Sequence, residues 1–178
     1  RVIQTVQPIL ATCAGLVLAY RLQTERQSAT AALRESEARY RTLIANIPGS
    51  VYRSEIQSPY RDLFLSEGIR NISGYEAREY FEPGGPTCGS LILADDLPGV
   101  EAEVNDAVQA KRPYQIRYRI RHRDGSIRWV SEHGQASFSP TGDPLYLEGI
   151  HLDVTAEVLA EQALRESVAR QRAIFEAA

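Results

Sequence analysis

Few side chains in this sequence are spaced for catalysis or metal binding. Asp95 and Asp96 are adjacent, but neighbouring residues at a helix start point apart, so the capping of a helix N-terminus is the simplest role for either carboxylate. Cys13 and Cys88 belong to no Cys/His spacing that builds a zinc site or a disulfide framework, and we interpret both as packing residues. The segment GIRNISGYE lacks the glycine spacing and the lysine of a phosphate-binding loop. We therefore expect no catalytic residue and no metal site.

The strongest local pattern is a β-hairpin around Asp124-Gly125. Strict alternation of side-chain character runs into this dipeptide and out again, which is a short-range hairpin signature. With a two-residue turn, Ile120 pairs with Trp129 and Tyr118 pairs with Ser131. One face then carries Tyr114, Ile116, Tyr118, Ile120, Ile127, Trp129, Ser131 and His133. The opposite face carries Arg117, Arg119, Arg121, Arg128 and Glu132, with Arg117 paired to Glu132.

The apolar face of this hairpin supplies the candidate ligand-binding residues, which are Tyr118, Trp129, Ser131 and His133. A locally hydrogen-bonded strand residue is the simpler interpretation of His133, although its ring could reach inward. The aromatic residues lie opposite the arginines, so the arginines lack stacking platforms for nucleic acid. A net charge of −3 also gives no field that attracts nucleic acid or an anionic membrane. We expect no nucleic-acid partner.

The other elements that must position these residues are short. Residues 49–54 and 61–66 are β-prone, residues 69–81 indicate one or two helical turns, and the run EPGGPTCG breaks the pattern. A longer helix is expected within residues 91–110, with Asp95 or Asp96 as its cap and Pro98 in its first turn. A third strand follows the hairpin at residues 145–152. This order predicts an α+β domain with an antiparallel sheet.

Two nearly identical segments flank this region. Residues 32–41 read ALRESEARYR and residues 163–172 read ALRESVARQR, an offset of 163 − 32 = 131 residues with eight of ten positions identical. Both contain good helix formers and mixed charges, which is typical of exposed helices. Each has a narrow apolar stripe, given by Ala29, Leu33, Ser36, Tyr40, Leu43 and Ile47 and by Ala160, Leu164, Ser167, Gln171, Ile174 and Ala178. Such a stripe suits pairing with one partner helix, or folding back onto the same domain.

The N-terminal residues 1–30 form a separate problem. The run ILATCAGLVLAY at residues 9–20 is apolar, but it is shorter than the roughly 20 residues that span a bilayer. A buried helix therefore fits better than a membrane anchor, although hydropathy leaves both open. The chain contains no Met and begins at Arg1, so we expect a segment of a longer polypeptide.

The motifs ISGYEAREYF, ADDLPGV, RIRHRDGSIRWV and EGIHLDVTAE, in this order, resemble a bacterial PAS domain with its C-terminal PAC motif, over about residues 40–157. The resemblance implies a five-stranded antiparallel sheet in the order 2-1-5-4-3, with small helices on one face and connector helices at both ends. QPILATCAGLVLAYR also resembles the last helix of a GAF domain. The expected organisation is a GAF tail or membrane anchor (1–30), a connector helix (31–47), the PAS/PAC domain (48–157) and a connector helix to a further module (158–178).

The family resemblance also implies a function. It points to a non-catalytic, cytoplasmic sensory and dimerising module. The expected parent protein is a histidine kinase or a cyclic-di-GMP enzyme, with or without a membrane association. A homodimer through the connector helices and a signal-relay hinge at Asp153 and Thr155 are expected. Alternatives are a structural dimerisation domain without ligand, or a haem or flavin sensor. Haem and flavin are not favoured, because residues 95–110 contain no His and Cys88 lacks the flavin-binding Asn-Cys-Arg-Phe motif.

Overall fold

The computed structural model describes the backbone of residues 2–176 and the side chains of residues 20–172. The chain divides into two units, residues 1–44 and residues 45–178. The first unit is a single helix, α1 (Val2–Ala45). The helix continues without interruption from the segment that we expected to be a GAF tail or membrane anchor into most of the expected connector helix. In the part of the chain that the structure describes, no helix combines the length and the hydropathy that crossing a bilayer requires.

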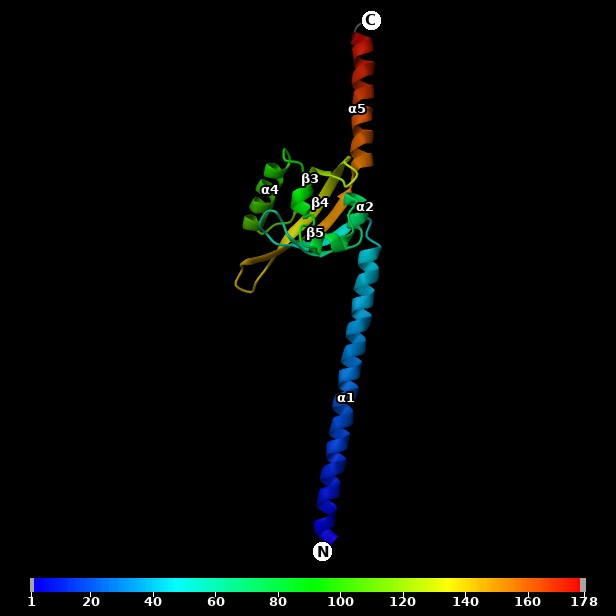
Figure 1. Ribbon diagram of the computed structural model, residues 1–178, viewed down its shortest axis with the longest axis vertical. Coiled ribbons are helices and arrows are strands. Elements are labelled where there is room, and N and C mark those ends of the chain that lie inside the picture. Colours follow the sequence, from blue (N-terminus) through cyan, green and yellow to red (C-terminus); the bar gives the residue numbers. More distant parts are fainter. Residues whose placement is uncertain (1, 177–178) are drawn as a thin grey trace. The chain divides into compact units, whose positions relative to one another are not determined.

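The second unit is built on a five-stranded antiparallel sheet (Figure 1). Its strands are β1 (Ser50–Ser54), β2 (Asp62–Leu65), β3 (Tyr114–Arg121), β4 (Ile127–Phe138) and β5 (Pro144–Asp153). Their order across the sheet is β2-β1-β5-β4-β3, which confirms the predicted order. Because β5 lies in the centre, the last strand of the domain contacts both β1 and β4 along its length.

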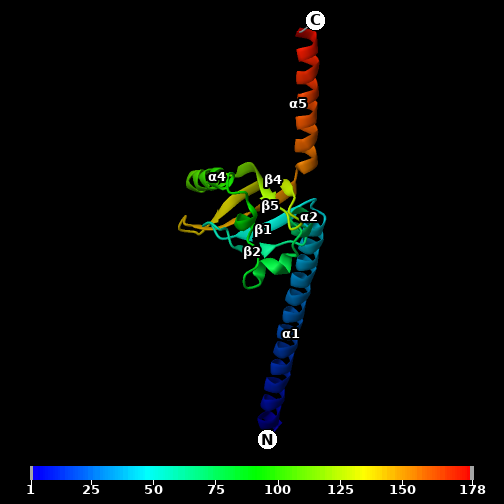
Figure 2. The ribbon, with the colours of Figure 1, turned by 45° about the horizontal axis from the view of Figure 1, so that its top comes forward.

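Short helices connect β2 to β3 and cover one face of the sheet (Figure 2). They are α2 (Ile69–Ser73), the 3-10 helix η1 (Ala77–Phe81), α3 (Cys88–Leu91) and α4 (Leu97–Ala110). Helix α3 was missed, because the Gly/Pro-rich run before it indicated only a break; Thr87 starts it by accepting a hydrogen bond from Ser90 N at 3.1 Å. The apolar core lies between these helices and the sheet, and its most buried members are Ile72, Val100, Val104, Ala107, Val130 and Leu147.

The hairpin between β3 and β4 has a different register from the predicted one. Ile120 lies opposite Arg128, and Arg119 lies opposite Trp129, so the prediction was wrong by one residue. The reason is a three-residue loop: Gly125 N donates to His122 O at 2.9 Å, and Gly125 adopts a left-handed conformation with φ of 87°. Because side chains alternate along a strand, this single shift exchanges the two faces of β4.

Helix α4 begins where it was expected, but its cap is unusual. Asp96 occupies the N-cap position and Pro98 lies in the first turn. The Asp96 side chain accepts no hydrogen bond from the backbone of α4; its carboxylate binds Arg119 on β3 instead. The predicted capping interaction was therefore wrong, since the carboxylate connects the helix to the sheet.

The last helix, α5 (Thr155–Glu176), follows β5 after a single intervening residue. Asp153 Oδ1 accepts a hydrogen bond from Thr155 N at 2.9 Å, as the sequence predicted for the start of this helix. Figure 1 shows α5 leaving the domain at the end of β5. The strand and the helix are therefore joined by a short, hydrogen-bonded hinge.

Two glycines with open space around them test the backbone conformations of the hairpin loop and of the first turn of α4. A Cβ at Gly125 or Gly99 would meet no atom within 4 Å, so only conformation distinguishes them. Gly125→Ala should destabilise the domain by about 1–2 kcal/mol, because a Cβ disfavours the left-handed conformation of the hairpin loop. Gly99→Ala should stabilise it by about 0.5–1 kcal/mol, because Gly99 lies within the first turn of α4. Urea denaturation measures the change in the free energy of unfolding of both variants. If Gly125→Ala stabilised the domain as Gly99→Ala does, the left-handed conformation of the hairpin loop would be contradicted.

Candidate functional site

A buried carboxylate lies at the centre of the sheet face that the helices cover. Glu132, on β4, is only 7% exposed. Three tyrosine hydroxyls donate hydrogen bonds to it: Tyr52 from β1 and Tyr114 from β3 bind Oε1, the latter at 2.9 Å, and Tyr118 from β3 binds Oε2 at 2.7 Å. The opposing strand residue of Tyr114 is Gly134, where a Cβ would lie 2.5 Å from the Tyr52 hydroxyl, so a glycine leaves room for the tyrosines. This arrangement satisfies the hydrogen-bonding capacity of an ionised carboxylate.

A histidine completes the cluster. His151, on β5, is 4% exposed, and its Nε2 lies 3.7 Å from Glu132 Oε2. Its ring stacks on the Tyr52 ring with a centroid separation of 4.3 Å. The second ring nitrogen, Nδ1, is buried and has no hydrogen-bond partner. Because buried polar atoms are normally paired, this nitrogen is a free hydrogen-bonding position inside the domain.

The ionisation of the cluster follows from these contacts. Burial by itself raises the pKa of Glu132, but the facing ring nitrogen of His151 and the hydroxyls of Tyr52 and Tyr118 lower this pKa to about 2. Burial raises the pKa of Tyr118 well above its ordinary value, and the nearby charge of Glu132 raises it further. The tyrosines therefore remain protonated donors around a charged Glu132.

Two small cavities adjoin this cluster between the sheet and the helices. Each offers about 20 Å³ to the centre of a water molecule, which is room for about one water. Tyr118, Cys88 and His151 line both cavities, and Val100 and Val104 of α4 line the first. Burial raises the pKa of the Cys88 thiol well above its ordinary value, so the thiol is a neutral part of the cavity wall.

A second buried carboxylate stands beside Cys88. Asp62 is 4% exposed, and its Oδ2 accepts a hydrogen bond from Cys88 N at 3.1 Å. Its other oxygen, Oδ1, is buried without a partner. Burial raises the pKa of Asp62, while the bond from Cys88 lowers it in part. The interior therefore contains two unpartnered polar atoms of different character, one on Asp62 and one on His151.

The size of the cavities limits which cofactors fit. A porphyrin or an isoalloxazine ring is larger than the space beside Tyr118 and His151, so either would require the short helices to move. Within the described part of the chain, no three His, Cys, Asp or Glu side chains gather in an arrangement that could hold a metal ion.

The structure separates the four residues predicted to bind a ligand. Tyr118 faces the interior and lines both cavities. Trp129, Ser131 and His133 alternate with Val130 and Glu132 and therefore lie on the opposite face of the sheet, where Ser131 Oγ and His133 Nε2 are 3.3 Å apart. The predicted pairing of Arg117 with Glu132 was wrong for the same reason.

Glu132, His151 and Tyr52 were missed as interior polar residues, whereas Tyr114 was placed on the face of Tyr118 but not among the ligand-binding candidates. The signal for Glu132 was the apolar or small character of its alternate neighbours Val130, Gly134 and Ala136, which indicates the buried phase of the strand.

Trp129 shares a face of the sheet with Arg119, contrary to the prediction that placed the aromatic residues opposite the arginines. The Arg119 guanidinium lies 5.6 Å from the centre of its ring and is bound to Asp96, so the indole is no free stacking platform.

The predicted relay residues lie together at the hinge between β5 and α5. Thr155 Oγ1 accepts a hydrogen bond from Trp129 N at 2.9 Å, and the Asp153 carboxylate lies 3.7 Å from Arg128 of the hairpin. Val154 N donates to Trp129 O at 2.9 Å. The first residues of α5 are thus attached to strand β4 through its backbone.

The fold is that of a known family. A model of the PAS fold matches residues 62–151, which is half of the chain. The chain belongs to the PAS family.

The chain is similar to parts of several signalling proteins. The two-component sensor PprA of Pseudomonas aeruginosa is 27% identical over 88% of this chain, and the methyl sulfide methyltransferase-associated sensor of Methanosarcina acetivorans is 31% identical over 57% of it. The chain spans 16% and 10% of the lengths of these proteins. A sensory box histidine kinase/response regulator of Burkholderia thailandensis is similar in structure, with 28% identity and a TM-score of 0.60 over 75% of this chain and 98% of that one.

The buried Glu132 predicts how stability depends on pH. Its pKa is 4.5 without these contacts and about 2 in the folded domain, so the unfolded chain binds more protons between these values. The stabilisation is complete above about pH 4.5 and is lost as the pH falls toward 2; at about 1.4 kcal/mol per pH unit it amounts to about 3 kcal/mol. Glu132→Gln should therefore lower the free energy of unfolding by about 3 kcal/mol at neutral pH and flatten its fall in acid.

The control is Glu166→Gln, which removes a charge from an exposed position on α5. Urea denaturation from pH 2 to pH 7 compares the two variants with the parent chain. An acid dependence in Glu132→Gln as steep as that of Glu166→Gln would show that Glu132 is not the stabilising carboxylate.

Proposed function

We propose that this chain is the sensory module of a signal-transduction protein, and that it passes a change in its polar interior to helix α5. The single observation that supports this most directly is the course of β5. His151 belongs to the Glu132 cluster, and only two residues later Asp153 forms the hinge that starts α5. Since alternate residues of a strand share a face, a displacement of His151 moves Asp153 with it.

The input site in this proposal is the pair of cavities beside Tyr118 and His151. Their size admits a molecule not much larger than water unless the short helices move, and the unpartnered His151 Nδ1 offers it a hydrogen bond. The ligand we expect is thus a small polar molecule, or a larger one that opens the space under α3. A charged Glu132 nearby favours ligands that carry a hydrogen-bond donor or a positive charge.

The output in this proposal is a change in the position of α5 relative to the sheet. Asp153 and Thr155 are the relay residues, because their side chains make the hydrogen bonds that define the first turn of α5. Arg128 adds an ion pair to Asp153 from the hairpin. Small shifts at a helix start become larger displacements along a helix of this length.

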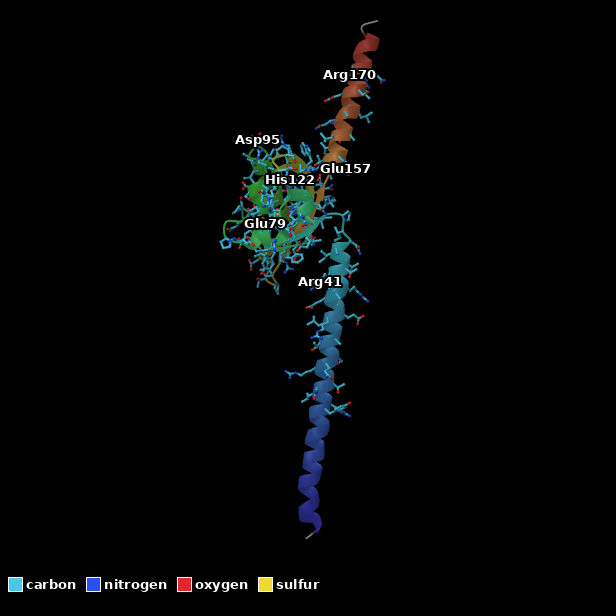
Figure 3. The ribbon with its side chains drawn as sticks, turned by 45° about the vertical axis from the view of Figure 1, so that its right-hand side comes forward. Arg41, Glu79, Asp95, His122, Glu157 and Arg170 are labelled. Atoms are coloured by element: carbon cyan, nitrogen blue, oxygen red, sulfur yellow. The ribbon has the colours of Figure 1, made fainter. Side chains whose placement is uncertain are left out.

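Homodimerisation through the helices is part of the proposal. On α1, Leu33, Tyr40 and Leu43 of the predicted stripe are 60%, 63% and 58% exposed. On α5, Leu164 of the second stripe is 65% exposed, and Figure 3 shows side chains from Glu157 to Arg170 projecting freely around this helix. Of the remaining stripe residues, the side chain of Ile174 and the whole of Ala178 lie outside the described residues. Apolar stripes exposed on long helices favour pairing with a second helix.

The parent protein we propose is a sensor histidine kinase, a class to which the similarity with a two-component sensor and with a histidine kinase structure lends support. A cyclic-di-GMP enzyme is the other parent that the sequence indicated. In either case the chain itself is the non-catalytic input segment. The alternative is a domain that only dimerises, in which the buried polar cluster would serve the stability of the fold alone; in that case a change in the cluster would leave the output unaltered.

Dimerisation predicts the effect of charges on the stripe of α1. Leu33→Lys combined with Leu43→Lys should convert a dimer of the chain into a monomer, because two buried ammonium groups per helix oppose pairing. The matched control is Ala32→Lys with Thr42→Lys, which adds the same charge beside the stripe. Sedimentation equilibrium measures both; a dimer that survives the first pair, or a monomer with the control pair, would place the interface elsewhere.

The relay predicts that the hinge transmits an interior change to the output. In the full-length protein, Tyr118→Phe removes one hydrogen bond to Glu132 and should alter autophosphorylation. Asp153→Ala should abolish this alteration, since the hinge no longer follows β5. Asp143→Ala, in the loop before β5, is the control and should preserve it. Melting temperatures of all variants exclude loss of folding; an effect of Tyr118→Phe that is equal with and without Asp153 would contradict the relay.

A further inference from the structure

One cross-strand pair of the sheet connects two helices. Arg119 on β3 and Trp129 on β4 lie directly opposite each other. Strand β3 is at the edge of the sheet, and the backbone of Arg119 faces away from β4. Its N–H donates to Asp96 Oδ2 at 2.7 Å, and its carbonyl oxygen accepts from Leu93 N at 2.9 Å. Both peptide groups of Arg119 are thus held by the segment that begins α4.

The side chain of Arg119 strengthens this attachment. Its Nε and a terminal nitrogen donate to the two carboxylate oxygens of Asp96 at 3.0 and 2.6 Å, which is a bidentate ion pair. The hydrogen bonds from Arg119 lower the pKa of Asp96, so the carboxylate stays charged. One and two turns beyond Asp96, helix α4 places Val100 and Val104 in the wall of the first cavity. Motion of the cavity wall therefore reaches Arg119 through Asp96.

The backbone of Trp129 faces the other way. Its N–H donates to Thr155 Oγ1 and its carbonyl oxygen accepts from Val154 N, both at 2.9 Å, so both peptide groups are held by the start of α5. The Arg119 guanidinium lies 5.6 Å from the centre of the Trp129 ring. Opposite residues that are not hydrogen-bonded to each other have closely spaced side chains in an antiparallel pair. The pair is therefore a direct physical connection between the two helix starts.

We propose that Asp96, Arg119 and Trp129 are positioning residues that couple helix α4 to helix α5. This is a second route from the cavities to the output helix, and it joins the route through His151 and Asp153 at Thr155. Its use in signalling rests on the proposed function, but the coupling itself is a property of the domain. Because coupling between two sites is reciprocal, a substitution at the start of either helix should change the stability of the start of the other.

Hydrogen exchange of the 178-residue chain tests the coupling without any output domain. Asp96→Ala should speed the exchange of the Val154 and Val158 amides, which bond to Trp129 O and Val154 O, by roughly 2- to 30-fold. The central β5 amide of Ile150 should change less, because it reports global unfolding. In the reverse direction, Thr155→Val should speed exchange of the Val100 amide, which bonds to Asp96 O at 3.1 Å.

Asp106→Ala is the matched control. It removes an ion pair of the same kind, from Asp106 to Arg112 at 2.6 Å, at the far end of the same helix. It should leave the Val154 and Val158 amides unchanged. If Asp96→Ala does not fold, Arg119→Lys keeps the charge but loses the bidentate geometry, and it should produce the same pattern.

The outcomes separate the coupling from the proposed function. Selective acceleration at Val154 and Val158 by Asp96→Ala supports the coupling. Unchanged exchange at these amides, equal acceleration at Ile150, or the same effect from Asp106→Ala overturns it. If the coupling is absent while the relay through Asp153 still controls autophosphorylation, the second route fails and the sensory function stands. If hydrogen exchange supports the coupling but Tyr118→Phe leaves autophosphorylation unchanged, the proposed sensory function is contradicted and the coupling stands.

Discussion

The need to satisfy one buried carboxylate shapes the interior of this domain. A charged Glu132 removed from water would be strongly unfavourable without donors, and three other strands supply its surroundings: Tyr52 from β1, Tyr114 and Tyr118 from β3, and His151 from β5. These contacts require the observed strand order, because they bring β1 and β3 to the two sides of β5 and β4. The same contacts fix the register, since a shift of one residue would turn Glu132 out of the core. The polar cluster therefore specifies the arrangement of the sheet as well as its chemistry.

Apart from the short helix α3, the order and type of elements could be predicted from the sequence, because they depend on local patterns. Alternation in β3 and β4, the breaks around Pro48 and Gly49, and the composition of α5 each indicate one element. The family resemblance then gave the order of the strands, which no local pattern contains. Thr155 and Asp153 could be identified because a cap lies next to the helix that it starts.

The site could not be predicted, because it depends on a choice that the hairpin sequence leaves open. Asp124-Gly125 fits a two-residue turn, and it also fits the end of a three-residue loop with Gly125 in the left-handed conformation. The two loops place opposite faces of β4 inside. Only long-range packing decides between them: Glu132 inside finds three hydroxyls, whereas the other phase would bury the Trp129 indole and His133. Likewise, the Asp96 carboxylate binds Arg119, 23 residues away, which no helix-start rule reveals.

The attachment of α4 to β3 also bears on how the protein behaves at high concentration. Strand β3 is one of the two edges of the sheet, and an exposed edge is a template on which strands of other molecules can add. At Arg119 both outward peptide groups are already occupied, by Leu93 and Asp96, and the neighbouring arginines place like charges along the same strand. The opposite edge, β2, has only four residues. Both edges of the sheet therefore offer little free backbone to a strand of another molecule, which disfavours edge-to-edge aggregation.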